Sequence, residues 1–196
     1  DGSGDLLDYE APEKGESSSE SSSVSTNRKI IERISLRVET KEFDLLLNKL
    51  EEELAKLGGY MESSSVSGNS YRYEGNRYAN LTVRVPSEKT SGFTTFVSEN
   101  STITNKEVST EDVTLSYVDM ESRVSALETE KAALESLLAK AETVDDIIII
   151  RNQLTDVIYE IESYESRLRA YDNLIEYTTI SIYISEVERV TVVEEE

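Results

Sequence analysis

The feature that most constrains the fold is a long stretch in which apolar residues recur every three or four positions. It covers residues 115–177 and breaks once, at Thr143. A repeat near 3.5 residues is typical of helices that pack along a shared seam. Since the break leaves only a short link, the two helices must run in opposite directions. The sequence therefore predicts an antiparallel coiled-coil hairpin arm at 115–177. Its predicted seam comprises Tyr117, Met120, Val124, Leu127, Lys131, Leu134, Leu138, Ala141, Ile147, Ile150, Leu154, Val157, Ile161, Tyr164, Leu168, Tyr171 and Ile175.

A charged residue occupies one seam position, Lys131. A lysine there can fix the register of two helices, and Glu160 on the returning helix is a candidate partner. Alternatively, the lysine stem packs in the seam while its ammonium group reaches water. Both interpretations are compatible with a stable hairpin.

The composition of the 196-residue chain excludes the common catalytic centres. It contains no cysteine and no histidine, which removes the usual neutral-pH general base, the commonest zinc ligands and the Ser-His-Asp and Cys-His centres. No calcium-loop or phosphate-loop motif is present. We therefore predict that the chain is not an enzyme and expect no catalytic residues, metal or cofactor.

The charge balance restricts the partners. Forty acidic and twenty basic residues give a formal net charge of −20, which repels phosphate backbones, so we expect no nucleic-acid binding. The same charge repels an anionic membrane surface unless the chain is anchored there by other means. No apolar run is long enough to span a bilayer.

Residues 1–27 are rich in serine and acidic side chains and poor in apolar ones. Such a composition cannot bury enough apolar surface to offset chain entropy, so we predict a disordered acidic linker. It is either a tether or a passive tail. The tether is favoured because the segment ends where an ordered domain begins.

An α+β sheet domain is predicted at 28–114. Alternating apolar and polar residues predict strands, and apolar stripes predict intervening helices. The order βαββαβ is typical of the ferredoxin-like plan, with a four-stranded antiparallel sheet and two helices on one face. The hairpin is then inserted, and a final strand at 178–191 returns to the sheet. We expect that strand to lie beside the one from which the hairpin departs.

The tip of the arm contains a first candidate binding surface. Four consecutive isoleucines begin at Ile147, of which Ile148 and Ile149 lie partly off the seam, with Val144 close by. An apolar patch at the end of a stalk could dock a partner. The favoured alternative is that the link folds over and buries these side chains.

A second candidate surface groups Tyr71, Tyr73 and Tyr78 with Arg72 and Arg77. Aromatic and arginine side chains are common at protein interfaces, and the rings could also stack on a sugar of a cell-wall glycan. The favoured alternative is ordinary β-propensity, with tyrosines covering a sheet face.

Several segments, taken in order, resemble one bacterial family, the domain-of-unknown-function family 4349. They include residues 28–38, Gly58-Gly59-Tyr60, residues 81–86 and residues 111–123, and the likeness continues to residue 187. The resemblance implies an exported lipoprotein attached to the membrane through segments outside this chain, hence an extracytoplasmic location. It brings no catalytic residues.

These observations favour a non-enzymatic, membrane-anchored interaction or structural protein of the cell envelope. An envelope protein partner or self-association is expected, through the two candidate surfaces. The alternative is an envelope sensor or ligand-binding module coupled to a membrane helix.

Overall fold

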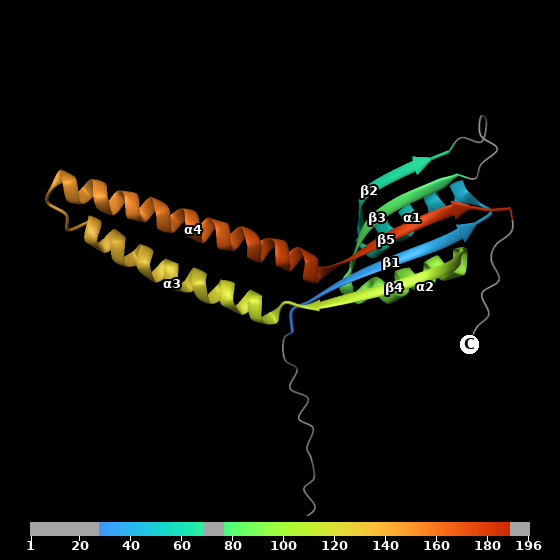
Figure 1. The fold of residues 1–196 in the computed structure, drawn as a ribbon, viewed down its shortest axis with the longest axis horizontal. Coiled ribbons are helices and arrows are strands. Elements are labelled where there is room, and N and C mark those ends of the chain that lie inside the picture. The colour runs from blue at the N-terminus through green and yellow to red at the C-terminus, as the bar shows by residue number, and fades with distance from the viewer. Residues whose placement is uncertain (1–27, 69–76, 189–196) are drawn as a thin grey trace, which may run out of the picture.

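A computed structural model of the protein describes residues 28–68 and 77–188. The linker predicted at 1–27 and the last residues predicted for the final strand, 189–191, lie outside the described residues. Figure 1 shows a twisted sheet, from one end of which two long helices extend side by side. The described part of the chain is therefore of mixed α+β class, with a five-stranded mixed sheet and four α-helices.

Four strands and two shorter helices precede the two long helices along the described part of the chain. The strands are β1 (Ile30–Thr40), β2 (Tyr60–Ser67), β3 (Tyr78–Pro86), β4 (Thr102–Asp112) and β5 (Tyr177–Glu186). The helices are α1 (Phe43–Leu57), α2 (Thr90–Asn100), α3 (Thr114–Leu138) and α4 (Val144–Glu176), with a 3-10 turn at Ser87–Lys89 before α2.

The position of β5 corrects the sequence-based expectation. The strand order is β2-β3-β5-β1-β4, with β5 parallel to β1 and antiparallel to β3. The expectation that the last strand lies beside β4 is therefore wrong, and the sheet is mixed because β5 runs parallel to β1. The physical reason is burial, because Ile180, Ile182 and Ile184 are at most 1% exposed and need apolar neighbours on both sides. The strand β4 is polar and mostly exposed, which suits an edge.

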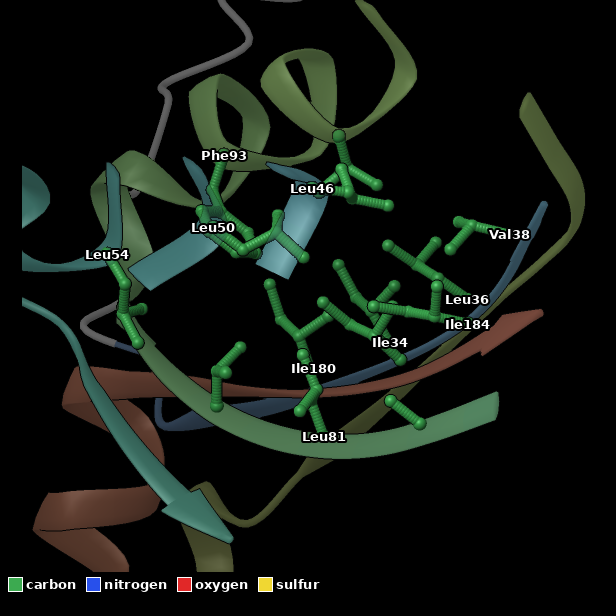
Figure 2. Packing of buried hydrophobic residues seen from close by; sticks show 14 of the residues in the cluster. Ile34, Leu36, Val38, Leu46, Leu50, Leu54, Leu81, Phe93, Ile180 and Ile184 are labelled. Atoms are coloured by element: carbon green, nitrogen blue, oxygen red, sulfur yellow. The ribbon is translucent and has the colours of Figure 1, made fainter. Parts of the chain in front are cut away.

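Rows of apolar side chains cross the sheet through β5. They are formed by Val38, Ile184 and Ala79, by Leu36, Ile182 and Leu81, and by Ile34, Ile180 and Val83. The helices α1 and α2 cover this face with buried side chains that include Phe43, Leu46, Leu50, Leu54, Phe93 and Val97 (Figure 2). Burial of each large side chain contributes roughly 1.5–3 kcal/mol, so this core fixes the sheet that carries the long helices.

The helices α3 and α4 form the arm, residues 114–176. Every residue predicted for the seam is buried or half-buried, and a second apolar cluster centres on Leu127, Leu134, Val157 and Ile161. Thr143 caps α4, since its hydroxyl accepts a hydrogen bond from the amide of Asp146 at 3.1 Å. The apolar repeat and this cap together account for the long, separate arm.

Candidate functional site

The base of the arm is joined to the sheet by a partly buried polar junction. The Tyr117 hydroxyl of α3 donates a 2.7 Å hydrogen bond to Asp172 of α4, and the Lys29 ammonium lies 4.3 Å from the centre of the Tyr117 ring. The hydrogen bond to Asp172, together with burial, raises the pKa of Tyr117 to about 12. The Val113 amide also donates to the Lys29 carbonyl. These contacts hold the arm in a defined direction relative to β1.

Ser87 strengthens this junction from another side. Its hydroxyl contacts the carbonyl oxygens of Ile175 at 2.5 Å and Glu176 at 2.8 Å, which are left without helical partners at the end of α4. Ser87 begins the 3-10 turn that precedes α2, but its side chain makes no cap hydrogen bond there. Ser87 and Ile175 are 88 positions apart, so no local sequence pattern indicates this contact.

The predicted tip residues are exposed. The exposed fractions are 70% for Val144, 52% for Ile148 and 56% for Ile149. The favoured interpretation, in which the link buries them, is therefore wrong. The link spans only residues 139–143, and this length is used to turn the chain and to cap α4 at Thr143.

A shallow hollow of about 430 Å³ lies on one side of the tip. Ile149 of α4 and Leu137 of α3 line it, with Ile150 between the helices. Glu142 and Asp146 supply negative charge at its border, and Lys140 supplies a positive one. An apolar hollow with a mainly acidic border is suited to a complementary protein side chain.

Ile148 and Ile149 face different flanks of α4. Consecutive residues of an α-helix are about 100° apart, whereas residues four apart share a face. Ile148 therefore lies on the flank of Val144, whereas Ile149 lies on the flank of the hollow. Both flanks of the tip consequently carry an exposed isoleucine.

Only one of the three tyrosines of the second candidate surface lies within the described residues. Tyr71 and Tyr73 lie outside the described residues. Tyr78 is 42% exposed and its ring stacks on Tyr183 of β5, with ring centres 6.2 Å apart. No local sequence pattern indicates this pair, because Tyr183 belongs to β5, whose position in the sheet was predicted wrongly.

Arg77 has a structural role. It contacts Glu186 at 2.8 Å and Asp44 at 3.0 Å, and its guanidinium lies 4.8 Å from the centre of the Phe43 ring. The hydrogen bonds from Arg77 lower the pKa of Glu186 below its ordinary value. Since these acceptors are already satisfied by Arg77, its guanidinium is committed to linking α1, β3 and β5.

The proposed pair of Lys131 with Glu160 is wrong. Lys131 lies 4.0 Å from Glu135 on its own helix, whereas Glu160 lies 3.3 Å from Arg123. The interhelical ion pair therefore forms two turns closer to the base of the arm. The alternative interpretation, in which the ammonium group reaches water, agrees with a side chain that is 41% exposed.

The sheet face that lacks helices carries a further hollow of about 330 Å³ that the sequence reasoning missed. Its side chains include Ser35 and Arg37 of β1, Thr82 of β3, and Ser181 and Tyr183 of β5. The signal was present as polar residues alternating with core residues in each strand. The order of the strands was required to bring them together.

Within 28–68 and 77–188, no three acidic side chains are grouped closely enough to hold a metal ion. None of the described helices combines the length and apolar character needed to cross a membrane.

The comparisons with known proteins give one match. The model of the family described as "Domain of unknown function (DUF4349)" matches residues 28–196. No curated protein and no solved structure gives a significant match.

Proposed function

Because the chain belongs to the DUF4349 family, we propose that it is a non-enzymatic protein of the bacterial cell envelope that presents the tip of its arm to a protein partner. The complete absence of histidine and cysteine supports the non-enzymatic part. The sheet is then a rigid platform, and the arm is the element that reaches the partner.

We also propose a more specific architecture for the sheet and for the arm. Without β5, the strand order would read β2-β3-β1-β4, which is the ferredoxin-like order. We interpret the sheet as that plan with β5 inserted between β1 and β3. The apolar cluster around Leu127 and Ile161 supports a coiled-coil arm, whose longer helix of 33 residues reaches about 50 Å.

The proposed location is extracytoplasmic, with a lipoprotein-type anchor or a membrane helix in segments outside these residues. The family resemblance supports this, as does the acidic, serine-rich composition of residues 1–27, which suits a tether. Fractionation of cells that express the full-length protein tests it. We expect the protein in the membrane fraction and digestible by protease added to intact cells. Recovery in the cytosol would contradict the proposal.

The observation that carries the proposal is the exposure of large apolar side chains at the tip. Leu137, Val144, Ile148 and Ile149 are each at least half exposed. Leaving such a side chain in water forgoes roughly 1.5–3 kcal/mol. A partner that covers them recovers this free energy on binding.

The charged side chains around the tip hollow indicate what kind of protein surface would bind there. Glu142, Asp145 and Asp146 surround the tip, with Lys140 as the nearby cation. A second copy would place like charges opposite one another, which opposes self-association. We therefore propose a different protein that inserts an apolar side chain into the hollow and carries lysine or arginine around that contact.

A photo-crosslinking residue at position 149 of the full-length protein, in its own cells, tests this proposal. We expect a defined adduct with a second protein from position 149. Position 159, where Tyr159 is 73% exposed on the shaft of the arm, is the control and should give none.

The partner identified in this way should bind the purified chain, and its affinity should fall at least tenfold with Ile149→Ser. Equal adducts from both positions, or an unchanged affinity, would contradict docking at the tip. An adduct only between two copies of the chain would replace the proposed partner with self-association.

A further inference from the structure

The open face of the sheet has a floor of small hydroxyl side chains. The strand registers place Ser63 beside Thr82, Thr82 beside Ser181, and Ser181 beside Ser35. This row crosses β2, β3, β5 and β1, a distance of about 14 Å at the usual strand spacing. We call it the hydroxyl row.

Larger side chains stand on both sides of the hydroxyl row. Two residues along the strands, Asn80, Tyr183 and Arg37 are direct neighbours in one row. Arg84 and Arg33 flank the hydroxyl row on its other side, as paired neighbours of Thr179. The hydroxyl row is thus the floor of a shallow trough.

The lining of the hollow in this trough differs in charge from the chain, although Glu107 of β4 lies beside Ser35 at the end of the hydroxyl row. Arg37 is the only charged residue among those lining the hollow, although the chain has a formal net charge of −20. Arg33 and Arg84 are paired with Glu111 and Glu62, respectively. Arg37 takes part in none of the ion pairs of the described residues and is exposed. A free guanidinium is suited to a carboxylate, which it can bind through two parallel hydrogen bonds.

The remaining groups indicate a ligand rich in hydroxyls. The strands β1, β3 and β5 each have hydrogen-bonded neighbours on both sides, so the trough offers side chains rather than free backbone groups. Serine and threonine hydroxyls both donate and accept hydrogen bonds, which matches ligand hydroxyls. Tyr183 adds an aromatic surface, and its stacking on Tyr78 limits the motion of the ring.

We propose that this trough binds an acidic oligosaccharide, one whose sugar units carry carboxylate groups. Arg37 binds a carboxylate, the hydroxyl row and Asn80 bind sugar hydroxyls, and a sugar ring packs against Tyr183. This site lies on the sheet and does not depend on docking at the arm tip. A peptide fits less well because the floor has no apolar pocket or free strand edge, and the net charge of the chain opposes nucleic acid.

Titration of the isotope-labelled chain with tri-galacturonate, followed by NMR of its backbone amides, tests the proposal. The matched neutral probe is a galactose trisaccharide. We expect shifts centred on Ser35, Ser181 and Tyr183, with tighter binding of the acidic probe. Absence of shifts at millimolar probe, or shifts elsewhere on the chain, would overturn the proposal.

Two variants separate the contributions of charge and stacking. Arg37→Gln should weaken binding of the acidic probe about tenfold or more while leaving the neutral probe nearly unchanged. Tyr183→Ala should weaken both probes. Arg123→Gln and Tyr159→Ala, which change the same residue types on the arm, should alter neither. Equal affinity of the Arg37→Gln variant and the unmodified chain for tri-galacturonate would overturn the assignment of Arg37.

Discussion

The hydroxyl of Tyr117 donates a 2.7 Å hydrogen bond to the carboxylate of Asp172, which ties the first turn of α3 to the last turns of α4. These residues are 55 positions apart, so the bond closes the arm at its base. There the arm meets the sheet through β1 and β5, and the direction of the arm depends on this closure.

Tyr117→Phe should lower the free energy of unfolding by about 1–2 kcal/mol, because it removes a hydrogen bond to a charged acceptor while keeping the ring. Urea denaturation measures this loss. Tyr159→Phe is the control, because Tyr159 is 73% exposed, and it should leave stability unchanged. Equal effects of both changes would contradict a structural role for the hydroxyl.

The same bond predicts a pH dependence. Asp172 and burial raise the pKa of Tyr117 from 10.0 in the unfolded chain to about 12. Its stabilisation is therefore complete below pH 10 and is lost as the pH rises towards 12. The stability difference between the unmodified chain and Tyr117→Phe should shrink over that interval. A constant difference would show that the hydroxyl stays protonated or makes no contribution.

The ion pair of Arg77 with Glu186 predicts how stability changes at acidic pH. Its hydrogen bonds to Glu186 lower the pKa of that carboxyl from 4.5, so the stabilisation is present above 4.5 and is lost as the pH falls further. Arg77→Met should cost about 2 kcal/mol at neutral pH, since the pair is largely shielded from water. The midpoints of urea unfolding, measured for both chains at acidic pH values, report this loss of stability. Arg123→Met, which removes an exposed pair with Glu160, should cost less than about 1 kcal/mol.

The arm was the part of the fold most accessible to sequence reasoning. The seam positions of α3 and α4 follow a repeat between residues close in the chain, so Leu127 or Val157 can be assigned without knowing the rest of the fold. The same holds for Thr143, whose capping partner Asp146 is three residues away. Repeats and hydrogen bonds between residues close in the chain can be predicted from the sequence, because they do not depend on the rest of the fold.

The sheet order was not accessible in the same way. The alternating isoleucines of β5 show that one face is buried, but they do not identify the two neighbouring strands. Those are chosen by the whole core, in which Ile182 lies between Leu36 and Leu81. The trough on the other face depends on that choice, so Arg37 and Tyr183 could not be recognised as neighbours. Arg77 was grouped with nearby tyrosines for a similar reason, although its partner Glu186 lies 109 positions away.

A glycine is required at position 59, because the backbone between α1 and β2 passes close to Arg84 and Leu54. A Cβ atom there would lie 2.5 Å from the Arg84 carbonyl oxygen and 2.6 Å from Cδ1 of Leu54. Gly59→Ala should therefore cost about 1–3 kcal/mol in unfolding experiments. Gly92→Ala is the matched control, since no atom lies within 4 Å and α2 gains a better helix former. It should stabilise the chain by about 0.5–1 kcal/mol. A harmless Gly59→Ala would disprove the close contact.

The seam of the arm can be tested with a carboxylate. Leu134→Asp places a charge at a position that is 9% exposed and packed in the apolar cluster. It should cost about 3 kcal/mol or more and reduce the helical signal in circular dichroism. Leu115→Asp, at a position of the same helix that is 83% exposed, should change stability by less than about 0.5 kcal/mol. Wild-type helicity in both variants would refute the packing of α3 on α4.

The four isoleucines at the tip allow an internal comparison. Ile148 and Ile149 are more than half exposed, whereas Ile147 and Ile150 are half-buried, and Ile150 packs against the cluster. Changing Ile148 and Ile149 to serine should leave the free energy of unfolding within about 0.5 kcal/mol of the unmodified chain. Changing Ile147 and Ile150 to serine should cost about 2 kcal/mol or more, because it removes packed methyl groups.

Urea denaturation of the two double variants makes this comparison, and binding to the crosslinked partner completes it. The outward pair should lose the partner while keeping its stability, because its side chains contact water in the isolated chain. If the outward pair instead destabilises the chain as much as the inward pair, Ile148 and Ile149 belong to the packing of the arm. The tip would then have no free apolar surface, and the partner would have to bind elsewhere.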